Sequence, residues 1–382
     1  MEETRSAPKC AEINVNYANH FREIVAGERR GLTGSLLRAA LRAIEVPYTW
    51  GTAWRNYQFD IGQRAARSVG VPVISVGNLS LGGTGKTPMV KWLATWLRGQ
   101  GLRVVIVSRG YGTSAGTAND EALELQQSLP DVPHVQNRDR VAAARIAVEQ
   151  WDAQVILADD AFQHRRLARD LDIVLIDCLE PFGYGHLFPR GTLREPIASL
   201  RRADGVCLTR VDMVHPDRRD RIRSQIQNIV PELPCCEASH KPSRLIDHHG
   251  QVRALDELAG VSVAAFCGIG NPHGFRHTLL STGCDLVGWR EFGDHHHFQP
   301  DDLDALTDWV RASGAEEVVC THKDLVKLPV ERIAEVRLSA VVVELEILRG
   351  QQALEQMLRI AITGERGNPG GDVEDCHLGT MT

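Results

Sequence analysis

Residues 71–97 read VPVISVGNLSLGGTGKTPMVKWLATWL, and this stretch decides the fold. Its first part, with Val71, Val73, Ile74 and Val76, is the short, β-branched, apolar run of a buried parallel strand. Three glycines follow within GGTGKT, where the backbone can bend freely and expose its N–H groups. Apolar residues then recur at helical spacing from Met89 to Leu97. The pattern predicts a strand, a glycine-rich loop and a helix.

This layout is typical of a phosphate-binding loop. Backbone N–H groups and the helix N-terminus cradle the phosphates, a lysine reaches the outer ones, and a hydroxyl binds Mg²⁺. Ser80 stands where the strict pattern G-x-x-x-x-G-K-[ST] has its first glycine. The alternative, a glycine-rich turn followed by a chance Lys-Thr, is disfavoured by the strand–loop–helix context. We expect nucleotide phosphates to contact Ser80, Leu81, Gly82, Gly83, Thr84, Gly85, Lys86 and Thr87, and Thr87 to hold Mg²⁺ as well.

Length and composition narrow the class of protein. At 382 residues the chain exceeds one typical domain, so we expect two. Its net charge of −6 argues against a general role in nucleic-acid binding. The nine cysteines include no C-x-x-C spacing, which is typical of a reduced cytosolic protein and not of a disulfide scaffold or a zinc ribbon. We find no signal-peptide pattern and no apolar run long enough for a membrane span.

The N-terminal region changes character near residue 31. Residues 1–30 are mixed and polar, and we expect them to be loosely ordered. From residue 29 to residue 70 there are seven arginines against two acidic residues. A basic amphipathic helix with aromatic residues beside it suits a membrane surface, whereas the alternative is a helix that packs on the core and leaves its arginines in solvent. The apolar helical face is Leu36, Leu37, Ala40, Leu41 and Ile44, and the aromatic residues are Tyr48, Trp50, Trp54 and Tyr57.

The chain after the phosphate-binding loop alternates between strands and helices. Strands are predicted at residues 103–108, 155–157, 172–177 and 205–209. The strand at 155–157 leads into Asp159 and Asp160, which is where a P-loop enzyme needs a partner for Mg²⁺. This alternation predicts an α/β fold with a doubly wound, mostly parallel sheet and ligands along its C-terminal edge.

Several polar residues follow these strands and are candidates for the same edge. Asp120 precedes a helical stretch and is either a functional acid or an ordinary helix N-cap. Gln163 and His164 follow the acid pair directly. The segment LFPRGTLREP at residues 187–196 carries Arg194 and Glu195 and is too long for a plain connector.

A second, smaller α/β unit is predicted after a linker that contains Pro231, Pro234 and Pro242. Its strands are expected at residues 262–266, 317–320 and 340–345. We therefore divide the chain into an N-terminal extension (1–30), a P-loop core with its N-terminal helix (31–235), a smaller α/β domain (236–347), a C-terminal helix (348–363) and a disordered tail (364–382).

Three adjacent histidines, His295, His296 and His297, lie in the predicted second unit. Adjacent residues rarely converge on one ion, and no acidic residue or thiol is spaced to complete a site. Three interpretations of this segment remain, in decreasing order of preference: it contains one functional histidine, it is an ordinary surface segment, or it holds a structural metal.

Taken together, these motifs resemble the tetraacyldisaccharide 4′-kinase family, the lipid A 4′-kinases. The resemblance runs from residue 71 to about residue 328, roughly two-thirds of the chain. Local departures are NDE for GDE, DDAFQH for DDGLQH, THKD for TEKD, and Thr192 where the family has proline. None of them removes a charged group that we assign to chemistry, although Ala161 and Thr192 bear on loop shape. The matching stretches are PVISVGNLSLGGTGKTP, VSRGYG, NDEAL, LADDAFQHRRL, DIVLID, LFPRGTLREP, CLTRVD, FCGIGNP, DHHHF and THKDLVKL.

The resemblance implies a reaction and a place for it. ATP would donate its γ-phosphoryl group to the 4′-hydroxyl of a tetraacylated glucosamine disaccharide 1-phosphate, with Mg²⁺ required, to give lipid IVA and ADP. The N-terminal helix would hold the enzyme peripherally at the cytoplasmic face of the inner membrane. By the same resemblance Asp120 is the base, His295 supports it, and Lys86 assists transfer. The cleft would be lined by Asn78, Arg109, Tyr111, Glu121, Gln163, His164, Arg194 and Glu195.

Two other functions fit parts of the sequence. One is a P-loop ATPase switch or assembly factor that acts on a protein partner, which DHHHF and LREP disfavour. The other is an inactive lipid-binding relative, which the intact Lys86, Thr87, Asp159 and Asp160 disfavour.

Overall fold

A computed structural model describes residues 21–29, 31–110, 120–294 and 296–364. The strands in these ranges are β1 (Val73–Asn78), β2 (Val104–Ser108), β3 (His134–Gln136), β4 (Val155–Asp159), β5 (Leu171–Asp177), β6 (Gly205–Thr209), β7 (Cys235–Ile246), β8 (Val252–Arg253), β9 (Ser262–Cys267), β10 (Asp285–Glu291), β11 (Glu317–Thr321), β12 (Arg332–Ile333) and β13 (Val336–Arg349). They form one sheet in the order β10-β9-β11-β13-β7-β6-β5-β1-β4-β2-β3, with β12 beside β13 and β8 beside β7. Only the pairs β7·β13, β7·β8 and β12·β13 are antiparallel among these described strands. The mostly parallel α/β sheet predicted from the sequence is confirmed.

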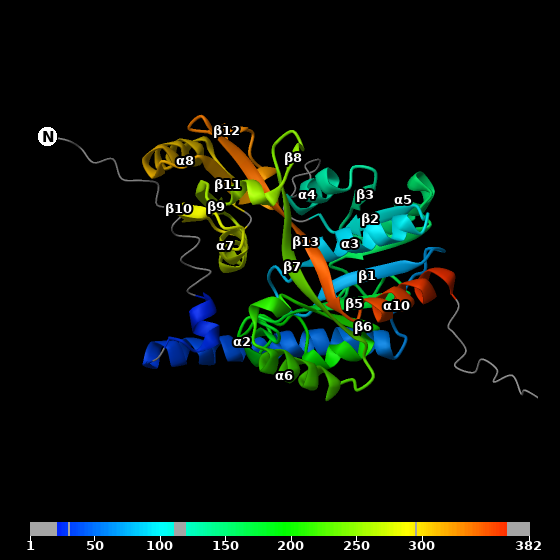
Figure 1. Ribbon diagram of the computed structural model, residues 1–382. Coiled ribbons are helices and arrows are strands. Elements are labelled where there is room, and N and C mark those ends of the chain that lie inside the picture. The colour runs from blue at the N-terminus through cyan, green and yellow to red at the C-terminus, as the bar shows by residue number, and fades with distance from the viewer. Residues whose placement is uncertain (1–20, 30, 111–119, 295, 365–382) are drawn as a thin grey trace, which may run out of the picture.

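Helices cover both faces of the sheet (Figure 1). Helices α3, α4 and α10 pack on one face in the region of β1, and α5 and α6 pack on the other. The C-terminal helix α10 thereby completes a core that begins at β1. The helices are α2 (Leu32–Asp60), α3 (Lys86–Gly99), α4 (Asp120–Ser128), α5 (Arg140–Trp151), α6 (Pro216–Gln227), α7 (Pro272–Leu280), α8 (Pro300–Ser313), α9 (His322–Leu325) and α10 (Gln351–Thr363).

Strand β1 lies in the middle of the P-loop half of the sheet, between β4 and β5. All six of its residues are buried, because helices cover the sheet on both sides. Val73 faces the core under α5, whereas Ile74 and Val76 face the core under α3. The continuous apolar run in the sequence therefore reflects a strand that is buried on both faces.

Two long strands, β7 and β13, connect the P-loop half (β1–β6 with α2–α6) to the second half (β8–β12 with α7–α9) (Figure 1). β7 pairs with β6 at one end, and β13 pairs with β11 at the other. The predicted linker is wrong from Cys235 onward, because β7 runs straight through Pro242. That proline lies at a register shift against β13, where a residue without an N–H group is tolerated. The sheet is continuous here, and the division into two domains stays a prediction.

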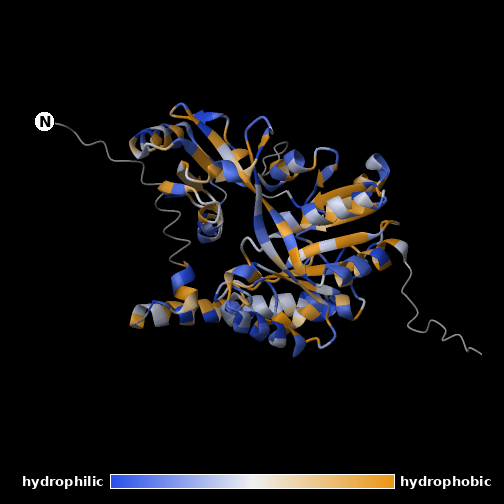
Figure 2. Ribbon diagram, in the orientation of Figure 1, coloured by the Kyte–Doolittle hydropathy of each residue, from blue (hydrophilic) through white to orange (hydrophobic). Residues whose placement is uncertain are grey.

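Helix α2 extends along the outside of the P-loop half (Figure 1). Of its 29 residues only Gly34 and Glu45 are buried. Leu36 and Trp50 are 70% and 73% exposed, so the helix does not pack on the core through its apolar face. Figure 2 shows hydrophobic residues along α2 at the edge of the molecule as well as in the strands. No helix among the described residues is both long and apolar enough to cross a bilayer.

The end of the N-terminal extension is more ordered than we expected. Residues 21–26 form a helical turn, and Ile24 and Val25 are buried. Arg22 donates a hydrogen bond to the carbonyl oxygen of Gly270 in the second half, at 2.7 Å. Residues 1–20, Arg30 and residues 365–382, which include nearly all of the predicted disordered tail, lie outside the described part of the chain.

Candidate functional site

The glycine-rich loop connects β1 to α3, as the sequence predicts. Gly82 and Gly85 have φ angles of 111° and 89°, a backbone region that side chains disfavour. Gly85 is also the N-cap of α3, so Lys86 and Thr87 form the first turn of the helix. The loop therefore places backbone N–H groups and a positive helix end at one point, which is an anion-binding arrangement.

Neighbouring segments hold the glycine-rich loop in place. The Thr209 hydroxyl donates to the carbonyl of Thr84 at 3.0 Å, and the Arg210 guanidinium donates to the carbonyl of Gly83 at 2.8 Å. On the other side, the Leu81 N–H group donates to the carbonyl of Thr192 at 2.7 Å. The loop is thus fixed between the end of β6 and the 187–196 segment.

Lys86 points toward the ends of β1 and β4. Its ammonium group lies 3.4 Å from Oδ1 of Asn78 and 3.6 Å from Oδ1 of Asp160. Asn78 in turn donates to the carbonyl of Ser80 at 2.6 Å and accepts at its own carbonyl from Gln163 at 2.8 Å. Asn78 is fully buried, so it orients Lys86 from behind the cleft and does not line it, contrary to our expectation.

The two aspartates at the end of β4 have different surroundings. Asp160 has a positive φ of 50°, and both of its carboxylate oxygens accept hydrogen bonds from Nη1 of Arg194, at 2.9 and 2.8 Å. Burial acts to raise the pKa of Asp160, but Lys86 and Arg194 outweigh it and hold the pKa below its usual value. Asp160 is therefore an ionised carboxylate that already has two cationic partners.

Asp159 is only 4% exposed, and its buried Oδ1 atom has no hydrogen-bond partner among the residues that the structure describes. Burial, the negative charge of Glu121 and that of Asp160 raise its pKa to about 7, against the opposing charge of Lys86. A buried carboxylate oxygen without a partner is costly unless a cation or a donor occupies the site. Asp159 thus has the chemistry of a ligand for a hard cation.

A cleft of about 980 Å³ opens above these residues. Its walls are the glycine-rich loop, helix α2 and the second half of the molecule. Five of the residues predicted to line it do so: Arg109, Glu121, Gln163, His164 and Arg194. Burial lowers the pKa of His164 to about 4, so its imidazole is neutral near pH 7.

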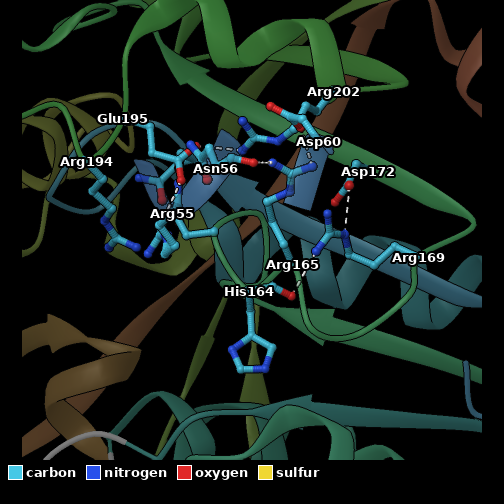
Figure 3. A network of polar contacts seen from close by, with 12 residues as sticks. Arg55, Asn56, Asp60, His164, Arg165, Arg169, Asp172, Arg194, Glu195 and Arg202 are labelled. Atoms are coloured by element: carbon cyan, nitrogen blue, oxygen red, sulfur yellow. Dashed lines mark hydrogen bonds and ion pairs between the residues drawn. The ribbon is translucent and has the colours of Figure 1, made fainter. Parts of the chain in front are cut away.

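Glu195 does not line the cleft, contrary to the prediction. It is fully buried, and its two carboxylate oxygens accept from Arg55 and Arg202 at 2.6 Å each. Figure 3 shows Glu195 with these arginines and with Arg194, the preceding residue in the chain. The segment thus directs Arg194 toward the cleft and Glu195 away from it.

Three predicted site residues fall outside what the structure describes. Tyr111 and His295 lie in undescribed positions, and of Asp120 only the backbone is described, as the first residue of α4. Beside His295, Nε2 of His296 donates a hydrogen bond to the Asp302 carboxylate at 2.9 Å, and the ring stacks on Phe292, while His297 is exposed. His296 thus has a local packing role.

The loop after β9 faces the glycine-rich loop across the cleft. A Cβ atom on Gly270 would lie 3.8 Å from the backbone nitrogen of Gly83 and 3.0 Å from a carboxylate oxygen of Asp294. The segment that contains Asp294 therefore lies close to the phosphate-binding region. Among the described residues, no group of three or more His, Cys, Asp or Glu side chains is arranged to hold a metal ion by itself.

Sequence reasoning missed several cleft residues. Arg140, which is 3% exposed, lies 3.5 Å from the carbonyl oxygens of Asp159 and Asp160. His240, on β7, lies against Gly85, and its buried Nε2 has no hydrogen-bond partner in the described part of the chain. Burial lowers the pKa of His240 to about 3. Neither residue belongs to a local motif. His240 could have been placed near the loop only by predicting strand β7, and Pro242 made that stretch look like a linker.

Known proteins resemble this chain over most of its length. Residues 37–363 match the family model described as tetraacyldisaccharide-1-P 4′-kinase. The chain is 41% identical to the tetraacyldisaccharide 4′-kinase of Anaeromyxobacter dehalogenans (strain 2CP-C), covering 87% of this chain and 92% of that protein. It is 36% identical to the protein of that name from Geobacter sulfurreducens, covering 81% and 89%. A crystal structure of Aquifex aeolicus LpxK, described as an "apo" form in complex with ATP, superposes with a TM-score of 0.68 at 29% identity and covers 85% of this chain and 99% of that one.

Proposed function

The chain belongs to the tetraacyldisaccharide-1-P 4′-kinase family, and on that premise we propose that it is an ATP-dependent kinase of lipid A biosynthesis. It transfers the γ-phosphoryl group of ATP to the 4′-hydroxyl of a tetraacyldisaccharide 1-phosphate, and lipid IVA and ADP are the products. The observation that carries the proposal is the phosphate-binding loop, with Lys86 beside Asp160, at the base of a cleft between the two halves of the chain.

ATP occupies the glycine-rich loop in this proposal. Residues 80–87 surround its phosphates, and Lys86 reaches the outer ones from the first turn of α3. The likeness to a LpxK structure that contains ATP supports this assignment. Because Lys86 and Arg194 both contact Asp160, two cations are held beside the expected position of the γ-phosphate.

Mg²⁺ is the expected cation at Asp159, and Thr87 is its second protein ligand. The fit rests on the buried Oδ1 of Asp159, which no described residue contacts by a hydrogen bond, and on the hydroxyl of Thr87 in the first helical turn. Mg²⁺ is commonly held by one or two protein ligands plus substrate phosphates, so a larger protein cage is not required. When bound, it supplies charge neutralisation on the transferring phosphates. Asp160 is assigned to orienting Lys86 and Arg194.

The acceptor hydroxyl enters from the side of α4 and the second half. Asp120 takes the proton of the 4′-hydroxyl, and the oxygen then bonds to the γ-phosphorus as the bond to the ADP oxygen breaks. His295 orients the Asp120 carboxylate or stabilises its charge. Family resemblance supports both roles, as does the position of the adjacent Asp294 near the glycine-rich loop.

Peripheral binding to a membrane is the proposed role of α2, at the cytoplasmic face of the inner membrane. Its support is the exposed apolar surface of the helix, including Leu36, Trp50 and Trp54, together with Arg38 and Arg42. Tyr48, Thr52 and Arg55 of the same helix line the cleft. A lipid acceptor could therefore place its acyl chains beside α2 while its sugar enters the cleft.

One assay tests the function. Purified protein is incubated with detergent, Mg-ATP and the tetraacyldisaccharide 1-phosphate, and the product is resolved by mass, with Lys86→Ala protein as the control for contaminating kinases. A gain of one phosphoryl group, absent from the control, is expected. Nucleotide-dependent dimerisation without a phosphorylated lipid would favour a P-loop ATPase that acts on a protein partner. Lipid binding without any turnover would indicate an inactive relative.

A further inference from the structure

Helix α2 is attached to the two segments that build the acid site. The Tyr48 hydroxyl donates to the carbonyl of Arg194 at 3.1 Å, and Arg55 pairs with Glu195 at 2.6 Å. Near its C-terminal end the helix accepts from Arg165, which follows the acid pair, at the carbonyl of Asn56 and at Asp60. A helix that served only to bind a membrane would not need polar contacts to these segments.

Glu195 is the centre of the attachment (Figure 3). It is 0% exposed, and each of its carboxylate oxygens has one arginine partner, Arg55 from α2 and Arg202 from the segment Ile197–Arg202. The guanidinium carbon of Arg202 also lies 4.6 Å from the centre of the Phe162 ring, two residues after Asp160. A buried carboxylate with two partners cannot lose one of them cheaply, since the remaining charge is left undercompensated. Arg55 therefore sets where Glu195 lies.

Arg194 is held on both sides of its own backbone. Its N–H group donates to the carbonyl of Leu79, at the start of the glycine-rich loop, at 2.7 Å. Its carbonyl accepts from Tyr48, and the following residue is fixed by Arg55. With the backbone fixed in this way, the Arg194 side chain reaches both oxygens of Asp160, which in turn lies beside Lys86.

We propose that Arg55 and Glu195 are positioning residues for Arg194, so that the exposed helix α2 also sets the geometry of the phosphoryl-transfer site. The inference rests on the proposed function. It extends that function because α2 becomes part of the reaction machinery and is not only a membrane attachment. A displacement of about 1 Å in a group that neutralises phosphate charge is enough to slow the reaction strongly.

A double-mutant cycle between Arg55 and Arg194 tests the proposal on the full-length protein in the detergent assay. Arg55→Gln is expected to lower kcat about tenfold while KM for ATP changes less than about threefold. Arg55→Lys should retain an intermediate kcat. In the Arg194→Ala background, Arg55→Gln should have almost no further effect, because the group that it positions is absent. Losses that multiply fully in the double variant would overturn the proposal.

Asp60→Asn is the matched control. It removes the ion pair with Arg165 at the other end of α2, where the Asp60 side chain is 58% exposed, and leaves the hydrogen bond from Arg165 to the carbonyl of Asn56, so the attachment at that end persists. Its kcat should stay near that of the wild type, and binding to vesicles of anionic phospholipid should be unchanged by Asp60→Asn and by Arg55→Gln alike. An equal loss of kcat in the two variants, or a change confined to vesicle binding and to KM for the lipid, would mean that α2 acts only as an attachment.

Tyr48→Phe covers the case in which Arg55→Gln does not fold. It deletes one hydroxyl without exposing a charge, and kcat should fall about threefold, again only when Arg194 is present. An unchanged kcat in a folded Tyr48→Phe protein would count against positioning by α2. Wild-type protein that forms no phosphorylated disaccharide would reject the proposed function instead. In that event the double-mutant cycle of Arg55 and Arg194 is measured on the rate of Mg-ATP hydrolysis. The positioning proposal then requires that Arg55→Gln lower this rate only when Arg194 is present.

Discussion

The ammonium group of Lys86 lies 3.6 Å from Oδ1 of Asp160, the carboxylate that also accepts from Arg194. One anion thus fixes two cations at the mouth of the phosphate-binding loop. Holding the cations in place beforehand lowers the reorganisation that phosphoryl transfer requires. It also explains why Asp160, with its charge already compensated, is a weaker candidate for the metal than its neighbour Asp159.

Replacement of Lys86 tests the phosphate site. Lys86→Ala should lose most phosphoryl-transfer activity, at least about a hundredfold in kcat, because a positioned charge on the transferring phosphate disappears. The fold should survive, since Lys86 lies on a loop and helix end and not in the apolar core. Circular dichroism and the disaccharide assay measure the two effects. A folded Lys86→Ala protein with near-normal turnover would reject the assignment.

Because Asp159 and Asp160 are assigned different roles, replacing each one should have a different effect on activity. Asp159→Asn should lower Mg²⁺-dependent activity by about two orders of magnitude or more and raise the Mg²⁺ concentration needed for half activity. Asp160→Asn should lower kcat with a smaller shift in the Mg²⁺ requirement, because its partners are Lys86 and Arg194. Thr87→Ala should also raise the Mg²⁺ requirement. Full activity in both aspartate variants would show that the end of β4 is not the metal site.

Membrane binding through α2 is tested with its exposed tryptophans. Trp50→Ser and Trp54→Ser should weaken binding to anionic vesicles, and high salt should weaken binding of the unaltered protein, because apolar contact and screened charge both contribute. Trp151→Ser is the control, since Trp151 is 51% exposed at the end of α5, a helix that lies apart from α2 (Figure 1). Co-sedimentation with vesicles gives the comparison. Equal binding by all three variants would contradict a membrane role for α2.

Asp120 and His295 are predicted to act as a pair across the cleft. Asp120→Ala and His295→Ala should each lower kcat by about a hundredfold or more, with much smaller effects on nucleotide binding. The double variant should be far less than multiplicatively worse, because groups that act as a unit are non-additive. His296→Ala and His297→Ala should be milder. A double-mutant cycle on kcat decides the matter, and fully multiplicative losses would mean that no such pair exists.

A buried histidine between the halves predicts a pH dependence of stability. Burial lowers the pKa of His322 from 6.5 to about 4; Glu124 opposes the shift, and Lys91 and Arg244 add to it. Between pH 6.5 and pH 4, the imidazole of His322 is therefore protonated in the unfolded chain and neutral in the folded protein. The contribution of His322 to stability is complete above pH 6.5 and falls at up to about 1.4 kcal/mol per pH unit toward pH 4.

The measurement is denaturant unfolding between pH 7 and pH 4 for the wild type and for His322→Gln. Glutamine preserves a donor toward Gln127, which lies 2.7 Å from Nε2 of His322, and it does not titrate. The variant should lose less stability on acidification than the wild type. Parallel curves for the two proteins would show that His322 does not titrate in this way.

The sequence was most informative where contacts are local. The strand, loop and helix around GGTGKT were predictable because a β-branched run, glycines with positive φ and helical spacing each have a direct backbone cause. Strand β7 was missed because Pro242 and its polar neighbours resemble a linker, and only pairing with β6 and β13 makes them a strand. Lys86 and Asp160 could be assigned from motifs.

No pattern in the sequence predicted the contact between Arg55 and Glu195. The two residues are 140 positions apart, and nothing in the pattern around Glu195 shows that it faces inward while Arg194 faces the cleft. The inward direction follows from tertiary contacts with α2 and Arg202, which single-sequence periodicity does not encode.

The packing of α10 has a consequence for synthesis on the ribosome. Leu354 and Leu358 of α10, with Leu345 of β13, belong to the same apolar core as Ile74 of β1 and Leu97 of α3. The P-loop half is translated early, and α3 and α4 cover part of this side of its sheet, but the part that α10 covers stays open until α10 has left the exit tunnel. A nascent chain halted before α10 thus presents an open apolar surface, the kind of surface that chaperones bind.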